Sequence, residues 1–149
     1  MKIITKNKKA FFDYEILSRL EAGIVLTGNE VKSLRAGNVD LTGSFATVHE
    51  HELFMINCFI GMYSHAYEKK DDGTRRSRKL LLHRGELNRL IGDIARKGVT
   101  IVPLMLYLNA KGKIKVELGV AKHKKAHQRK EELKERDIRR ETARELKGT

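Results

Sequence analysis

The sequence has very little cysteine, proline or tryptophan: Cys58 and Pro103 are the only residues of the first two kinds, and tryptophan is absent from all 149 positions. A single cysteine excludes an internal disulfide and a thiolate-based zinc site, and it agrees with a reducing compartment. The longest apolar stretch, residues 99–108, is too short for a membrane-spanning helix, which needs about 20 residues. No secretory signal follows the basic N-terminus. We therefore expect a cytoplasmic protein without a membrane partner.

Acidic residues are also scarce relative to basic ones. The chain has 31 Lys and Arg against 19 Asp and Glu, a formal net charge of +12. An excess of this size indicates a polyanionic partner. No segment combines a broad apolar face with a basic face, as helices that lie on membranes do, so the expected partner is nucleic acid. With 40% hydrophobic and 34% charged residues, the composition is that of one folded domain rather than of a disordered chain.

Apolar spacing predicts the elements of the first 60 residues. Residues 12–20 alternate between apolar and polar, which predicts a strand with one buried face, continued by residues 24–26. Thr27 and Glu30 have the spacing of a capping box, and Gly37 is a typical helix stop, so we expect a short helix between them. Two apolar segments around the polar residues 49–52 predict a hairpin.

The second half of the body begins with a basic stretch, residues 64–79, which has no apolar periodicity and is expected to be a loop. Leucine and isoleucine then recur every three or four positions from 87 to 94, which predicts an amphipathic helix that ends at Gly98. Residues 99–108 and 114–120 are expected strands. Pro103 lacks an N–H, so its strand should lie at a sheet edge or carry a bulge there.

About six short strands with inserted helices, and no alternation of strands with helices, predict a mainly β fold. The expected architecture is a small antiparallel OB-like barrel with flanking helices, formed by a domain that spans residues 1–121. We expect this domain to be monomeric.

Residues 122–149 differ sharply from the body: they hold 11 Lys and Arg against 6 Asp and Glu, and almost no hydrophobic residues. Acidic and basic residues at i,i+3 and i,i+4 spacings suit a helix, but solvated ion pairs of about 0.3 to 0.5 kcal/mol cannot offset the ordering entropy alone. We therefore predict a basic tail that is disordered when free and helical on a partner.

Catalytic and metal-binding patterns are weak. His49 and His51 lie two residues apart in an expected turn without a third ligand at a recognisable spacing. No Walker A, nucleophile-elbow or H-E-x-x-H motif is present. We expect no metal, no cofactor and no enzymatic activity; the alternative, a hydrolase acting on RNA ends, would depend on residues 49–52.

Two groups of basic residues are candidates for nucleic-acid contact. Lys32 and Arg35 lie three apart on the expected helix, off its apolar face, where they could bind phosphates. The other group runs from Arg76 to Lys79 and leads into three leucines, residues 80–82, and His83. Cations beside apolar groups can bind an RNA backbone and pack against unstacked bases. Equally, the leucines could all be core residues and His83 a simple helix cap.

Several collinear stretches together resemble one family. They are NKKA at 7–10 with DY at 13–14, EAGIVLTGNEVKSLR at 21–35, RKLLLH at 78–83, KGVTIVPL at 97–104 and GVAK at 119–122. The chain resembles the SsrA-binding protein (small protein B) family over nearly its whole length. The resemblance implies an OB-like barrel with flanking helices and a tail that orders on the ribosome.

The resemblance also implies a function in trans-translation. Members of the family bind the tRNA-like part of transfer-messenger RNA and deliver it, with elongation factor Tu and after charging by alanyl-tRNA synthetase, to stalled ribosomes. The tail then occupies the empty decoding centre of the small subunit and the mRNA channel. A degradation tag is added to the incomplete peptide and the ribosome is released.

Residue by residue, the resemblance implies an RNA-binding surface made of Asn7, Glu21, Lys32, Arg35, Arg78, Lys79, Leu81 and His83. The implied tail contacts with the decoding centre are Lys122, Lys124, Lys125, His127, Arg129 and Lys130. Glu21 is unusual in a basic site; it could accept hydrogen bonds from base amino groups or 2′-hydroxyls, orient a neighbouring arginine, or be a plain surface residue.

The tail departs from the family pattern at His123, where the family has glycine, at Gln128, where it has aspartate, and near Ile138, where an aromatic residue is missing. The main alternative to the family function is a general RNA-binding or ribosome-associated OB module. Charge alone does not separate the two, because both would bind more weakly as salt rises.

Overall fold

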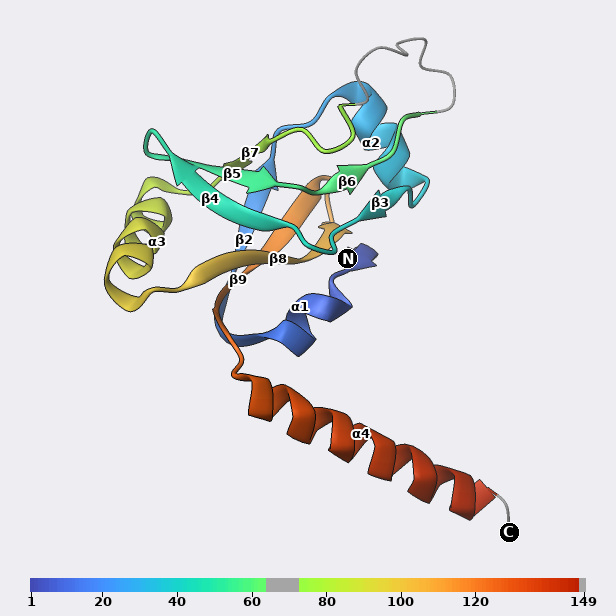
Figure 1. Ribbon diagram of the computed structural model, residues 1–149. Helices are drawn as coiled ribbons and strands as arrows, with labels where there is room; N and C mark the ends of the chain where they lie inside the picture. The colour runs from blue at the N-terminus through green and yellow to red at the C-terminus, as the bar shows by residue number, and fades with distance from the viewer. Residues whose placement is uncertain (64–72, 148–149) are drawn as a thin grey trace.

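The computed structural model describes residues 1–63 and 73–147, whose β-strands form a closed ring with helices on its outside (Figure 1). The strands are β1 (Lys2–Lys6), β2 (Tyr14–Ile24), β3 (Val39–Asp40), β4 (Phe45–His49), β5 (Glu52–Ile56), β6 (Phe59–Ile60), β7 (Arg78–Leu81), β8 (Thr100–Leu108) and β9 (Ile114–His123). The helices are α1 (Lys8–Asp13), α2 (Gly28–Arg35), α3 (Arg84–Lys97) and α4 (Ala126–Lys147).

The main sheet is antiparallel, with the strand order β1-β8-β4-β5-β7-β2-β9. Because β8 also pairs with β9, six strands close into a ring and β1 is added outside it at β8. This confirms the expected small antiparallel barrel. The short strands β3 and β6 form a separate pair beside α2.

The barrel interior is filled by alternate residues of the strands and closed by two helices. Leu53, Met55, Leu106 and Leu118 are fully buried there, with Leu34 of α2 and Leu90 of α3 in the same cluster. From Lys115 to Leu118, half-buried and buried residues alternate along β9 with the period of two that its sequence predicts, whereas the four residues from Leu118 to Ala121 are all buried. Cys58 lies in this core, and burial raises the pKa of its thiol to about 11.

Two predicted helices are present with the predicted signals. In α2, the Thr27 side chain accepts from the Glu30 backbone N–H and the Glu30 carboxylate accepts from the Thr27 N–H, a complete capping box. Helix α3 ends at Gly98, whose φ of +62° is the left-handed conformation that favours glycine. The predicted bulge at Pro103 is also present, because the β8–β9 register shifts between Pro103 and Met105.

The predicted strand over residues 12–20 is wrong at its start. Helix α1 continues to Asp13, and β2 begins only at Tyr14. The cause is Asn7, whose side-chain oxygen accepts from the Ala10 N–H, while its amide nitrogen donates to the carbonyls of Leu41 and Pro103. These two long-range bonds hold the start of a helix that is too short to show a period in the sequence.

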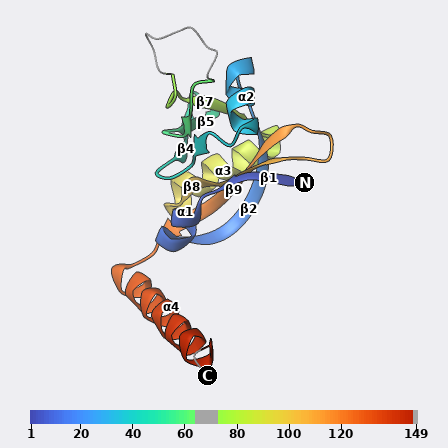
Figure 2. The ribbon, with the colours of Figure 1, turned by 90° about the vertical axis from the view of Figure 1, so that its right-hand side faces the viewer.

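The tail forms one helix, α4, which points away from the barrel in both views (Figure 2). Strand β9 extends to His123, so the body runs two residues beyond the predicted boundary at Ala121. No helix of the described residues is long and apolar enough to cross a membrane.

Candidate nucleic-acid interface

A groove of about 450 Å³ lies on the outside of the barrel between α2 and the strands β2, β7 and β9. Ile24, Leu26 and Val31 give it an apolar lining. Cations reach it from two sides, with Arg35 on α2 and Lys115 on β9 together with its neighbour Lys113. Apolar surface between cations suits a nucleic-acid strand, whose phosphates need positive charge and whose unstacked bases need a surface to pack on.

Leu81 is the exposed apolar side chain of this groove. It pairs across the sheet with Gly23, and a Cβ at that glycine would lie 3.3 Å from the Leu81 Cβ. The Leu81 side chain therefore covers a position without a side chain and remains 50% exposed. Leu80 is buried and Leu82 half-buried, so the interpretation as core residues applies to these two leucines and not to Leu81.

Glu21 lies on β2, two residues before Gly23 and so on the same face of the sheet. Its carboxylate accepts a hydrogen bond from the hydroxyl of Tyr107, a residue of β8. Arg19, the nearest arginine in sequence, instead pairs with Glu117 at 3.2 Å. The hydrogen bond that orients Glu21 thus comes from a tyrosine.

Lys32, Lys79 and His83, three further residues of the predicted RNA-binding surface, are not part of the groove lining. Lys32 is exposed on α2, its ammonium 5.1 Å from the centre of the Tyr63 ring. Lys79 forms a solvent-exposed ion pair with Glu52 at 3.0 Å, a contact weak enough for a phosphate to replace. His83 is exposed at the N-cap of α3, and its side chain makes no capping hydrogen bond.

Two predicted site residues are not on the surface. Asn7 is buried and its side chain is used in the contacts that begin α1. Arg78 is fully buried: its guanidinium pairs with Glu30 and donates to the carbonyls of Cys58 at 2.7 Å and Thr74 at 3.1 Å. Both side chains make structural contacts in this arrangement, and that they also contact RNA stays a prediction.

Glu30 is the centre of that buried network, since it also pairs with Arg76 and accepts from the Thr27 N–H. Burial raises the pKa of Glu30, but the hydrogen bonds from Arg76, from the Thr27 backbone and from Arg78 outweigh it, so the net pKa is lowered. The carboxylate is therefore ionised, and it joins the start of α2 to the segment that precedes β7.

Among the predicted tail contacts, Lys122, Lys125 and Lys130 are exposed. Lys124 is not a free cation: its ammonium lies 2.6 and 2.7 Å from the two carboxylate oxygens of Glu132 and 3.1 Å from the Phe11 carbonyl oxygen. The side chains of His127 and Arg129 lie outside the described part of the structure, as do residues 64–72 of the predicted basic loop.

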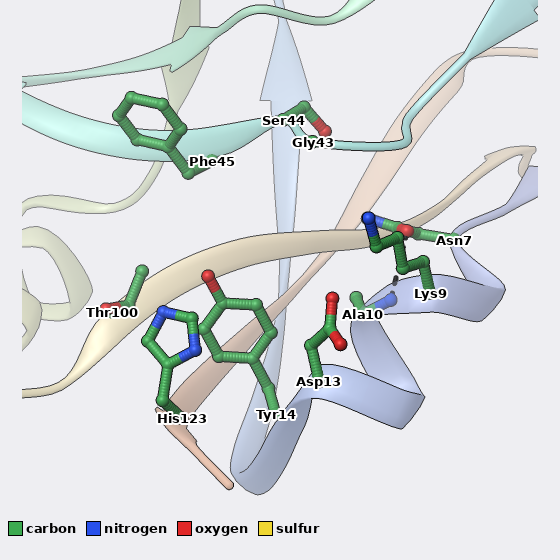
Figure 3. Close-up of a pocket in the computed structure, with 10 residues that line it drawn as sticks. All are labelled: Asn7, Lys9, Ala10, Asp13, Tyr14, Gly43, Ser44, Phe45, Thr100 and His123. Carbon is green, nitrogen blue, oxygen red and sulfur yellow. Dashed lines mark hydrogen bonds between the residues drawn. The ribbon is translucent and has the colours of Figure 1, made fainter. Parts of the chain in front are cut away.

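A second hollow, of about 180 Å³, lies where the tail leaves the body (Figure 3). The rings of Tyr14 and His123 face each other there with centroids 4.2 Å apart. This contact packs the end of β9 onto the start of β2, so the histidine that departs from the family pattern has a structural partner. Among the side chains that the structure describes, no three from His, Cys, Asp or Glu are grouped to hold a metal ion.

The sequence did not predict four residues in or beside the groove as part of a site: Gly23, Tyr107, Lys113 and Lys115. Alternation did indicate that Lys113 and Lys115 face outward, but their place beside Arg35 depends on the pairing of β9 with β2, in which Gly23 lies opposite Lys115. That pairing joins segments about 90 residues apart, and no local pattern encodes it.

Comparisons with known proteins agree on one family. The family model described as SmpB protein matches residues 4–148. Curated SsrA-binding proteins from Rickettsia africae and Rickettsia canadensis are 50% and 51% identical over 143 residues, covering 96% of this chain and 93% of each relative. A chain of a solved structure, "tmRNA-SmpB: a journey to the center of the bacterial ribosome", is 52% identical, with a TM-score of 0.66 over 82% of this chain and 85% of that one.

Proposed function

The chain belongs to the SmpB family, and from this premise we propose that it binds the tRNA-like part of transfer-messenger RNA and delivers it to stalled ribosomes for trans-translation. The observation that carries the proposal is the groove between α2 and β9. The motif residues Arg35 and Leu81 line it, and the motif residue Glu21 lies on β2 two residues before Gly23, which also lines it.

The chemistry of the groove supports recognition by shape. Arg35, Lys113 and Lys115 supply charge-assisted hydrogen bonds to phosphates, and Lys32 and Lys79 extend the positive surface. Leu81 offers an apolar contact to a base that is not stacked in a helix. Single-stranded loops of a folded RNA present both groups together, whereas a regular A-form helix does not expose its base faces.

The exposed tail cations, Lys122, Lys125 and Lys130, support a second contact, with ribosomal RNA in the decoding centre and mRNA channel. Elongation factor Tu and alanyl-tRNA synthetase would be partners only through the RNA. In this proposal the protein binds RNA without catalysis and acts in the cytoplasm with the ribosomes.

A competition titration tests the proposal. We expect tight binding to transfer-messenger RNA at about 150 mM salt that survives an excess of bulk tRNA. The double variant Lys32→Ala/Arg35→Ala should lose about 3 kcal/mol of binding free energy, because it removes two hydrogen bonds to charged groups, each worth about 1.5 kcal/mol at the lower end of their range. The fold should be unchanged, since both side chains are exposed.

The matched control is Arg89→Ala/Lys97→Ala, which removes the same charge from α3 at the other end of the barrel (Figure 1). It should bind almost as the wild type does. Equal losses in both double variants would indicate a general electrostatic surface. Binding that bulk tRNA abolishes would favour the alternative, a general RNA-binding OB module.

A further inference from the structure

We propose that Tyr107 is a positioning residue for RNA recognition, which holds Glu21 so that one carboxylate oxygen accepts a hydrogen bond from an N–H or O–H group of an exposed nucleotide. The inference rests on the proposed function and deepens it. It concerns how a carboxylate contributes to a surface that otherwise binds through cations.

The sheet register brings the two residues together. Tyr107 pairs with Lys115 across β8 and β9, and Lys115 pairs with Gly23 across β9 and β2. Leu106, Val116 and Ala22, the neighbours of these residues, are in the barrel core. By the alternation of strands, Tyr107, Lys115 and Gly23 all face outward, as does Glu21. The Tyr107 side chain therefore crosses β9 on the outer face to reach Glu21.

The hydrogen bond has a defined direction. Tyr107 is only 6% exposed, and burial, together with the hydrogen bond to Glu21, raises the pKa of its hydroxyl. The hydroxyl therefore stays neutral and donates to Glu21 Oε2. An ionised carboxylate only accepts hydrogen bonds, so the second oxygen of the exposed Glu21 remains available to a donor from outside.

The surroundings determine which ligand group fits. Glu21 has no ion pair with a lysine or arginine in the described part of the chain, because Arg19 is engaged by Glu117. A carboxylate that no cation neutralises repels phosphate but accepts from base amino or imino groups and from 2′-hydroxyls. With Glu117 directly opposite Glu21 and Lys115 two residues before Glu117 on β9, this carboxylate discriminates between a strand that places a donor at this point and one that places a phosphate there.

A double-mutant cycle on the full chain tests this inference. Tyr107→Phe keeps the ring and removes only the hydroxyl; we expect it to weaken transfer-messenger RNA binding about threefold to tenfold, and Glu21→Gln to weaken it about tenfold. In the Glu21→Gln background, Tyr107→Phe should have no further effect. The dependence of affinity on salt should keep its slope in all variants, because no phosphate contact is lost.

A purely structural role for Tyr107 predicts a different result: the same loss in both backgrounds, with lower thermal stability. That outcome, or no loss in either background, would overturn the inference. Replacing ribose by deoxyribose in the single-stranded part of the RNA identifies the donor group. If the donor is a 2′-hydroxyl, the replacement removes the tighter binding of Glu21 relative to Gln; if the donor is a base, the tighter binding remains.

One measurement does not involve RNA. An ultraviolet titration of tyrosine ionisation, with Tyr107→Phe to identify its signal, should give Tyr107 a pKa above that of ordinary tyrosines in the wild type. In Glu21→Gln, the pKa of Tyr107 should lie closer to the ordinary value. Identical ionisation in both would refute the pairing. If the titration confirms the Tyr107–Glu21 pair but the chain does not prefer transfer-messenger RNA over other RNA, the result counts against the proposed function and not against the pair.

Discussion

At the scale of single residues, the buried pair of Arg78 and Glu30 joins α2 to β7. The Arg78 guanidinium is fully buried and donates to carbonyls of the segments on both sides of residues 64–72, while Glu30 lies in the first turn of α2. A buried ion pair adds little net stability over apolar packing, but the loss of one partner leaves an unpaired buried charge. The pair therefore holds α2 in place relative to β7.

We expect Glu30→Gln to lower the free energy of unfolding at pH 7 by about 3 kcal/mol, the cost of leaving a buried arginine unpaired. Because the folded-state pKa of Glu30 is lowered, its stabilisation is present above the ordinary pKa of 4.5 and is lost as pH falls through the folded value. The difference between wild type and Glu30→Gln should therefore shrink in acid.

Urea unfolding at several pH values between 7 and 3 measures this difference. Glu52→Gln is the matched control, since Glu52 forms an ion pair with Lys79 that is exposed on both sides. Its effect should stay below about 1 kcal/mol. A pH-independent difference for Glu30→Gln would show that the carboxylate charge is not what stabilises the network.

The family motif around Arg78 predicted this residue as a member of the RNA-binding site, but it did not predict that the side chain is buried. In β7, Arg78 and Leu80 face inward while Lys79 and Leu81 face outward. The period of two accounts for all four positions once the strand is known to begin at Arg78. The sequence-based interpretation ended the basic loop at residue 79, so it placed the arginine in solvent.

At the scale of elements, local signals predicted α2 and α3, and long-range contacts explain why α1 was missed. A capping box and a terminal glycine act within a few residues, so a sequence pattern contains them. Helix α1 has six residues and depends on Asn7 bonding to Leu41 and Pro103. No pattern within residues 8–13 reveals those partners.

The direction of α4 depends on contacts at its first turns. Lys124 joins the Glu132 carboxylate to the Phe11 carbonyl, its backbone N–H donates to the Asp13 carbonyl at 2.9 Å, and the Arg136 guanidinium lies 5.7 Å from the Phe12 ring. These contacts tie the helix to α1. That the tail is disordered when free stays a prediction, which circular dichroism of the isolated segment 126–149 would test.

We expect Lys124→Glu to broaden the distribution of distances between the barrel and α4, because it places two carboxylates together. The double variant Lys124→Glu/Glu132→Lys should narrow it again by restoring an ion pair of opposite polarity. Electron spin resonance between labels at Ser18 and Glu135 measures the distribution. Lys134→Glu is a control of the same charge change; if it broadens the distances equally, net charge rather than this contact directs the helix.

At the scale of the whole molecule, the groove exists because β2 pairs with both β7 and β9. Gly23, Leu81 and Lys115 come from β2, β7 and β9, and only the pairing of β2 with both other strands brings them to one groove, beside which Glu21 lies on the same strand as Gly23. Family motifs identified most of these residues, and hydrophobic alternation predicted the strands. The neighbours of each strand depend on which pairing buries the most apolar surface over the whole chain, which no single segment determines.

The division between barrel and tail leads to the last prediction. Truncation after Lys125 should leave RNA binding by the groove within about threefold of wild type at 150 mM salt, because no groove residue is lost, and nonspecific attraction by the removed charges is weakened at this ionic strength. Tagging of peptides on stalled ribosomes should be abolished.

Truncation at the predicted boundary, after Ala121, would also remove the pairs of Lys122 with Glu15 and His123 with Tyr14, and so destabilise β2. Comparison of the two truncations separates loss of the tail from damage to the barrel. If the longer chain, which keeps all of β9, fails to bind the RNA, then the tail is part of the RNA-binding site and the two functions are not divided as proposed.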